Sequence, residues 1–118
     1  MVLIDIWASW CIPCIEKIPF IKSLDNIYKN VSVYYFSIDR DINKGRNAVL
    51  TLGIPKSKSF FLIGNINNSF VQQHKIDAIP RYMLYANDRL INDSLEFDSI
   101  QKNIIEAVEL LNQNEPRR

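Results

Sequence analysis

Two cysteines separated by two residues are the part of this sequence best suited to chemistry. They are the only cysteines in the chain, and they lie in the segment Trp10-Cys11-Ile12-Pro13-Cys14. A C-x-x-C pair near a β-α-β pattern is typical of a disulfide that opens and closes in redox reactions. The apolar run over residues 2–7 predicts a strand leading into the segment, and the pattern after it predicts a helix over residues 12–28. Cys11 would then lie at or near the helix start, where free N–H groups and the helix dipole lower the pKa of a thiol.

The residues that follow Cys11 fit the same interpretation. Pro13 fixes a helical φ angle and lacks a backbone donor, which costs little in the first turn of a helix. Cys14 lies three residues after Cys11, so its sulfur returns to the same helix face within reach of the first. We therefore expect Cys11 and Cys14 to form a redox-active pair.

Three other interpretations of the cysteine pair compete with a redox role. A zinc site needs about four ligands, and the only histidine, His74, has no second metal-type ligand beside it in the sequence. We therefore expect no metal and no other cofactor. A purely structural disulfide would close a very short loop, where a cross-link stabilises least. Two unrelated buried thiols would not explain why the cysteines occur in the pattern Trp-Cys-x-Pro-Cys.

Length and composition limit the class of protein. The chain has 118 residues, 47% of them hydrophobic, and a formal net charge of +1 at pH 7. These values predict a single domain over residues 1–118 with a core of its own. Because the charge is balanced and no basic block occurs, we expect neither nucleic acid nor an anionic membrane as a partner. No signal segment opens the sequence, so the protein is either cytoplasmic or exported by a segment outside this chain.

The hydrophobic pattern predicts alternating strands and helices. The expected strands are residues 2–7, 31–38, 81–86 and 89–92, and the expected helices are residues 12–28, 44–52, 69–74 and 100–111. Pro19 should kink the first helix. Residues 59–63 are either a short strand or a packed loop, and Asn87-Asp88 should form a hairpin turn. Residues 112–118 are expected to be a disordered polar tail.

Asp5 is an acidic residue within the apolar run of residues 2–7, six positions before Cys11. A buried carboxylate is costly unless it is paired, and its pKa tends to rise. Such an acid near the disulfide could exchange a proton with Cys14 during turnover. It could equally face a polar edge and only form hydrogen bonds, so both interpretations remain open at this point.

Ile79-Pro80 directly precedes the expected strand over residues 81–86. A proline at a strand entrance is normally an ordinary turn residue, since only about 5–6% of X–Pro bonds in folded proteins are cis. The residues alone therefore favour a trans bond here.

Two longer segments carry recognisable motifs. They are Asp5-Ile6-Trp7-Ala8-Ser9-Trp10-Cys11-Ile12-Pro13-Cys14, with Lys17-Ile18-Pro19 after it, and Ile76-Asp77-Ala78-Ile79-Pro80-Arg81-Tyr82-Met83-Leu84. Together they resemble the signatures of the thioredoxin superfamily, in particular its TlpA/ResA-like thiol–disulfide oxidoreductases. The resemblance implies an α/β fold, a thioredoxin-like three-layer α/β/α sandwich with a central mixed sheet and with the usual N-terminal strand missing. The spacing of the two motifs is longer than in plain thioredoxin, which matches the extra helix and strand of the TlpA/ResA-like branch.

The resemblance also implies roles for single residues. Cys11 would be the nucleophile, Cys14 the resolving thiol and Asp5 the buried acid. The residues expected to line the substrate groove are Trp10, Ile12, Pro13, Ile79 and Pro80. The Pro80 bond would be cis and would face the disulfide, and the Ile79 backbone would pair with a bound peptide as an added strand.

Two positions depart from the pattern of these relatives. Ile12 replaces the more common glycine or glutamate between the cysteines, a change that can alter the redox poise. Lys17 occupies the position where many relatives carry a glutamate, so a proton-transfer role at that position is not carried over.

The function implied by the resemblance is thiol–disulfide exchange with protein substrates. We expect net reduction of those substrates, with a separate thiol electron donor, because no histidine lies between the cysteines to stabilise the thiolate further. The expected location is the cell envelope or periplasm, with oxidised apocytochrome c or other disulfide-bearing proteins as substrates and any membrane contact through an anchor outside this chain.

Two alternatives to an oxidoreductase of this kind stay open. One is a redox-inert module that uses the same groove to bind a peptide. The other is a thiol peroxidase, which is disfavoured because Ile4 and Ala8 occupy the Pro and Thr positions of a P-x-x-x-T-x-x-C pattern.

Overall fold

Strand β1 (Val2–Trp7) forms the centre of the fold. In the computed structural model, which describes residues 1–114, it lies inside a five-stranded sheet with the order β3-β2-β1-β4-β5. The other strands are β2 (Ser32–Ser37), β3 (Ser59–Phe61), β4 (Arg81–Ala86) and β5 (Arg89–Leu95). Strands β1, β2 and β3 are parallel, whereas β4 is antiparallel to β1 and β5 is antiparallel to β4. The sheet is therefore mixed, as predicted.

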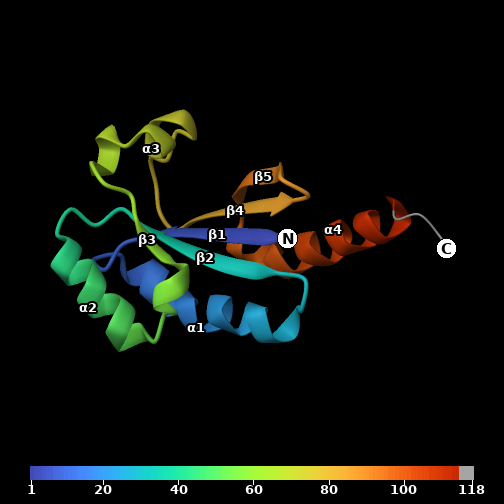
Figure 1. Cartoon of the computed structure of the whole chain (residues 1–118), viewed down its shortest axis with the longest axis horizontal. Coiled ribbons are helices and arrows are strands. Elements are labelled where there is room, and N and C mark those ends of the chain that lie inside the picture. Colours follow the sequence, from blue (N-terminus) through green and yellow to red (C-terminus); the bar gives the residue numbers. More distant parts are fainter. Residues whose placement is uncertain (115–118) are drawn as a thin grey trace.

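Helices cover both faces of this sheet (Figure 1). They are α1 (Ile12–Ile27), α2 (Ile42–Leu52), α3 (Ser69–Gln73) and α4 (Ile100–Asn114). Helices α1, α2 and α4 contribute to the larger apolar core, for example through Ile18, Val49 and Ile104. The short α3 covers the opposite face through Val71. This arrangement confirms the predicted thioredoxin-like three-layer α/β/α class.

Alternate residues of β1 point into the two cores. Leu3 and Trp7 are buried on the side of α1, whereas Ile4 and Ile6 are buried on the side of α3. Successive side chains of a strand point to opposite faces, so Asp5 shares the α1 face with Leu3 and Trp7. The alternation along β1 therefore determines on which side of the sheet this acid lies.

The observed strands and turns agree with most of the predicted ones and differ in some of their bounds. Residues 59–63, left open as a strand or a loop, contain β3, which pairs with β2. Strand β5 continues to Leu95, beyond its predicted end. The hairpin turn is confirmed, because Asn87 and Asp88 have φ angles of 51° and 62°, as two-residue hairpin turns require. Pro19 lies inside α1 without ending it.

The predicted tail over residues 112–118 is wrong at its start. Helix α4 continues to Asn114, so residues 112–114 are helical. Leu111 is still half-buried, and the N–H groups of residues 112–114 bond to carbonyls one turn earlier, so the helix does not end at Leu111. Residues 115–118 lie outside the described part of the chain.

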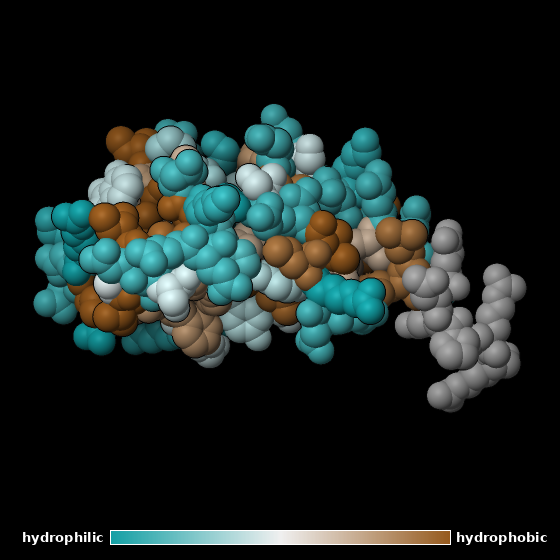
Figure 2. Space-filling model, turned by 90° about the horizontal axis from the view of Figure 1, so that it is seen from above, coloured by the Kyte–Doolittle hydropathy of each residue, from teal (hydrophilic) through white to brown (hydrophobic). Residues whose placement is uncertain are grey.

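The surface seen from the α3 side carries separate apolar patches among hydrophilic side chains (Figure 2). Large exposed apolar side chains include Ile63 and Ile66 between β3 and α3, and Leu90 and Ile91 of β5. Within the described chain, no helix is both long enough and apolar enough to cross a membrane.

Candidate active site

The turn after β1 places Cys11 at the start of α1. The Cys11 N–H donates a hydrogen bond to the Ala8 carbonyl at 3.1 Å, which closes the turn. Cys11 is the N-cap of α1, and its Sγ accepts the Cys14 N–H at 3.2 Å. Pro13 lies in the first helical turn, where its missing donor is harmless. The predicted position of Cys11 at the helix start is therefore confirmed.

Cys11 and Cys14 form a disulfide, with their Cα atoms 5.2 Å apart. Cys11 is 5% exposed and Cys14 is 1% exposed, so Cys11 is the more accessible residue of the two. In the reduced protein, the N–H group of Cys14 and the positive end of the α1 dipole would both stabilise a Cys11 thiolate. The geometry thus suits Cys11 to attack from outside and Cys14 to resolve from inside.

Large apolar side chains flank the disulfide at the surface. Trp10 is 64% exposed and Ile12 is also exposed, although both are large and apolar. An exposed apolar patch of this kind commonly marks a site where another molecule binds. The residues directly beside Cys11 are therefore suited to contact a substrate.

Asp5 lies in the sheet beneath the helix that carries the cysteines. It is 1% exposed, and its Oδ1 has no hydrogen-bond partner among the described residues. No ion pair within residues 1–114 involves it. Burial raises the pKa of Asp5 from 3.8 to about 8. The carboxyl lies in the core and not at a polar edge, and it is mostly protonated at neutral pH.

Two tyrosines flank Asp5, and neither was predicted to belong to the site. Tyr35 of β2 and Tyr82 of β4 pair with Asp5 in the sheet register. Directly paired side chains point to the same face of a sheet. Burial, reinforced by the Asp5 carboxyl, raises the pKa of both tyrosines above its ordinary value. The two rings therefore surround the acid with neutral groups and supply no cation that would favour its ionised form.

The Ile79-Pro80 peptide bond is cis, immediately before β4. The residues alone favoured trans, whereas the resemblance implied cis, and the structure agrees with the resemblance. Ile79 is half-buried and packs against both apolar cores.

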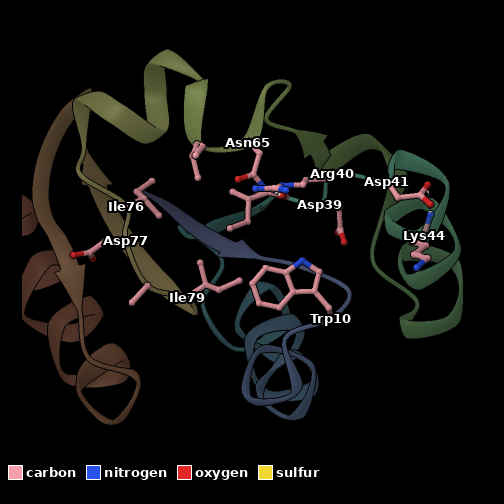
Figure 3. A pocket seen from close by; sticks show the side chains of 12 residues that line it. Trp10, Asp39, Arg40, Asp41, Lys44, Asn65, Ile76, Asp77 and Ile79 are labelled. Atoms are coloured by element: carbon pink, nitrogen blue, oxygen red, sulfur yellow. Dashed lines mark hydrogen bonds between the residues drawn. The ribbon is translucent and has the colours of Figure 1, made fainter.

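A groove with a volume of about 770 Å³ is lined in part by Trp10, the residue before Cys11. Its lining residues are Trp10, Ile38, Asp39, Arg40, Asp41, Lys44, Asn65, Ile66, Ile76, Asp77, Ala78 and Ile79. Trp10 and Ile79 lie in its middle, with Asp77 toward one end and Lys44 toward the other (Figure 3). Its size is within the range of pockets that hold small ligands or several side chains.

The groove brings together only part of the predicted substrate-binding set. Trp10 and Ile79 line it, whereas Ile12, Pro13 and Pro80 are not among its lining residues. The opposite wall includes Ile66, which is 62% exposed. This residue was missed because the segment before α3 shows no clear hydrophobic period.

The amino group of Lys17 contacts an aromatic ring and not the cysteines. Its Nζ lies 5.3 Å from the centre of the Phe97 ring, which is a cation–π arrangement on the α4 side. This contact gives the lysine a structural role at the position where relatives carry a glutamate.

The fold is similar to that of several solved structures, although no sequence comparison finds a relative. No family model matches the chain, and no curated protein sequence matches it. Solved structures do match. The C-terminal domain of a proposed thiol-disulfide oxidoreductase from Bacteroides thetaiotaomicron has a TM-score of 0.77 at 22% identity, over 92% of this chain and 76% of that one.

Two further structures give the same result. A thiol-disulfide oxidoreductase from Bacteroides fragilis has a TM-score of 0.77 at 20% identity, over 89% of this chain and 79% of that one. A proposed thiol-disulfide oxidoreductase from Bacteroides vulgatus has a TM-score of 0.76 at 25% identity, over 95% of this chain and 74% of that one. The chain therefore has the thioredoxin-like fold of thiol–disulfide oxidoreductases, and the predicted resemblance is confirmed for the fold.

Proposed function

We propose that this chain is a protein thiol–disulfide oxidoreductase that reduces disulfides in other proteins. The observation that carries the proposal is the Cys11–Cys14 disulfide at the N-terminus of α1, with the more accessible cysteine at the N-cap. A thioredoxin-like fold and the names of the matched structures support the same class of reaction.

The reaction begins with the reduced pair. The Cys11 thiolate attacks one sulfur of a substrate disulfide and forms a mixed disulfide, while the other substrate sulfur leaves as a thiolate and takes a proton. Cys14 then loses its proton and attacks the Cys11 sulfur, which releases the second substrate sulfur. Two electrons have passed to the substrate, and Cys11 and Cys14 are again a disulfide. A separate dithiol donor returns the two electrons and reopens it.

Asp5 is the proposed proton carrier for the inner sulfur. When the donor opens the disulfide, Cys14 leaves as a thiolate, and protonated Asp5 can give it a proton. In the opposite direction, the Asp5 carboxylate accepts the proton of the Cys14 thiol. A pKa of about 8 suits both steps, because a group titrating near the working pH can donate and accept.

The proposed substrate site combines the exposed side chains around Cys11 with the segment before β4. Trp10, Ile12 and Pro13 would contact the polypeptide on one side, and Ile79 and Pro80 on the other. An extended substrate segment would pair with the Ile79 backbone as an added strand. The groove between Trp10 and Ile79 would then hold side chains of that segment.

The direction and place of action follow from the resemblance to TlpA/ResA-like proteins. We propose reduction in the cell envelope, with oxidised apocytochrome c or another disulfide-bearing protein as the substrate. The proposed exchange uses the two sulfurs, Asp5 and an external dithiol donor, and it calls for no metal or other cofactor.

Trapping of mixed disulfides tests the proposed reaction. A Cys14→Ala variant can form the mixed disulfide with a substrate but cannot resolve it. We expect the reduced variant to become covalently linked to oxidised insulin, and dithiothreitol to release it. Cys11→Ala is the matched control and should form no adduct. If Cys14→Ala formed no adduct either, the chain would be a binding module and not an oxidoreductase.

A further inference from the structure

Asp39 is a buried carboxylate that the proposed reaction does not use. It follows β2, is 7% exposed, and lies on the wall of the groove beside Trp10 (Figure 3). A carboxylate in such a place is costly unless hydrogen bonds compensate for the lost water. Its partners therefore show what it stabilises.

Most of those partners belong to one residue of the turn before the cysteines. The Ser9 N–H lies 3.1 Å and 3.0 Å from the two carboxylate oxygens of Asp39, and the Ser9 hydroxyl donates to Oδ1 at 2.6 Å. The Ser37 hydroxyl donates to Oδ2 at 2.5 Å and accepts the Asp39 N–H at 2.9 Å. Asp39 thus joins the end of β2 to the turn after β1.

Ser9 needs such a partner because of its place in the turn. The turn from Ala8 to Cys11 is closed by the Cys11 N–H and the Ala8 carbonyl, and Ser9 and Trp10 are its two central residues. A closing hydrogen bond of this kind leaves the N–H of the first central residue unused. Asp39 takes up that N–H, so the carboxylate holds the backbone two residues before the reactive sulfur.

Helix α2 holds the carboxylate in place from behind. A Cβ atom at Gly45 would lie 3.1 Å from Asp39 Oδ2 and 2.5 Å from Cε1 of Phe61. Only glycine allows this close approach, so α2 packs directly against the acid. The Asp39 side chain therefore has little freedom to follow Ser9 if the turn moves.

We propose that Asp39 is a positioning residue for disulfide exchange. Its carboxylate anchors Ser9 and so keeps the reduced Cys11 sulfur at the N-terminus of α1, where the Cys14 N–H stabilises the thiolate. This inference rests on the proposed function.

Loss of the positioning role of Asp39 and loss of its negative charge would change the pKa of Cys11 in opposite directions. A loosened turn would weaken the contacts that stabilise the thiolate and would raise the pKa of Cys11. Removal of a nearby negative charge would by itself lower that pKa. The sign of the change therefore separates the two.

The experiment measures the rate of alkylation by iodoacetamide against pH, in the Cys14→Ala background so that Cys11 is the only thiol. Asp39→Asn keeps the shape of the side chain but removes its charge and one acceptor oxygen. We expect the pKa of Cys11 to rise by about 0.5 to 1 unit, which is about 3- to 10-fold less thiolate at a pH below both values.

Two matched variants control the result. Ser37→Ala removes one buried partner of Asp39 without touching Ser9, and Asp41→Asn removes a nearby charge that bonds only to the backbone of α2. Both should leave the pKa of Cys11 within about 0.2 unit, although Ser37→Ala should lower the urea midpoint about as much as Asp39→Asn does. An unchanged or lowered Cys11 pKa in folded Asp39→Asn would overturn the proposal.

Ser9→Ala decides the question if Asp39→Asn does not fold. It removes only the hydroxyl bond and leaves the Ser9 N–H on the carboxylate, so a smaller rise in the same direction is expected. No rise would overturn the proposal. Iodoacetamide reacts with any thiolate, so the readout remains valid even if Cys14→Ala traps no substrate and the proposed function fails.

Discussion

At the scale of single residues, the buried carboxyl of Asp5 should make the stability of the fold depend on pH. Its pKa is about 8 in the folded protein and about 4 when the chain is unfolded. Between these values the folded state binds the extra proton, so the contribution of Asp5 to stability is fully present below about pH 4 and is lost as the pH rises to about 8. The loss is at most about 1.4 kcal/mol per pH unit.

This pH dependence gives a prediction for Asp5→Asn. Urea unfolding of the oxidised protein at pH 5, 6.5 and 8 should show a falling free energy of unfolding in the wild type. Asp5→Asn should remove most of this fall and be the more stable protein at pH 8. The exposed Asp41→Asn is the control and should follow the wild-type curve. Parallel curves for Asp5→Asn and the wild type would mean that Asp5 is ionised in the core.

The residues that carry the chemistry were predictable to different degrees. The position of Cys11 and Cys14 at a helix start was predicted correctly, because a strand, a short turn and a helix start are encoded within a few neighbouring residues. Tyr35 and Tyr82 were not, because only the sheet register brings them beside Asp5. Asp39 was missed for a similar reason, since its partner Ser9 is 30 residues away in the sequence.

At the scale of elements, the packing of α2 against β3 and the end of β2 supports the site. The close approach at Gly45 leaves no room for a side chain between α2 and Phe61. This contact lies on the far side of the carboxylate that anchors the turn before Cys11. A side chain at Gly45 should therefore affect both stability and the cysteines.

Substitution of Gly45 tests how tightly α2 packs against Phe61. Gly45→Ala should destabilise the oxidised protein by about 1–3 kcal/mol, because the new Cβ would lie only 2.5 Å from Cε1 of Phe61 and one of the two groups must shift. The exposed Asn47→Ala in the same helix is the control and should be neutral or slightly stabilising, since alanine favours a helix. Urea titrations measure both. A neutral Gly45→Ala would show that α2 can move away from Phe61 at little cost.

Element boundaries were predicted where the pattern was strong and not elsewhere. The β4–β5 turn was predicted because Asn87 and Asp88 readily adopt positive φ angles. The segment between β3 and α3 was not, because its residues follow neither a strand nor a helix period. That segment supplies Asn65 and Ile66 to the groove, so part of the candidate substrate site could not be read from the sequence.

At the scale of the whole molecule, four separate parts of the chain meet at one end of the sheet. The turn after β1, the segment after β2, the segment before α3 and the segment before β4 supply Trp10, Asp39, Ile66 and Ile79 to the same groove. The order of the strands, with β1 between β2 and β4, makes this meeting possible. The fold class was predictable because strands and helices alternate in the pattern and two motifs resemble those of a known superfamily. The structure brings these motifs together, since they include β1 and β4, which are neighbours in the sheet.

The reduction potential of the Cys11–Cys14 pair tests the central claim most directly. Thiol alkylation across a graded dithiothreitol or glutathione series gives the fraction of reduced protein at each potential. A disulfide reductase should show a reversible two-electron transition near that of thioredoxin, about −270 mV. A transition near about −120 mV would instead indicate a disulfide-forming oxidant, and no reversible transition would contradict any role in disulfide exchange.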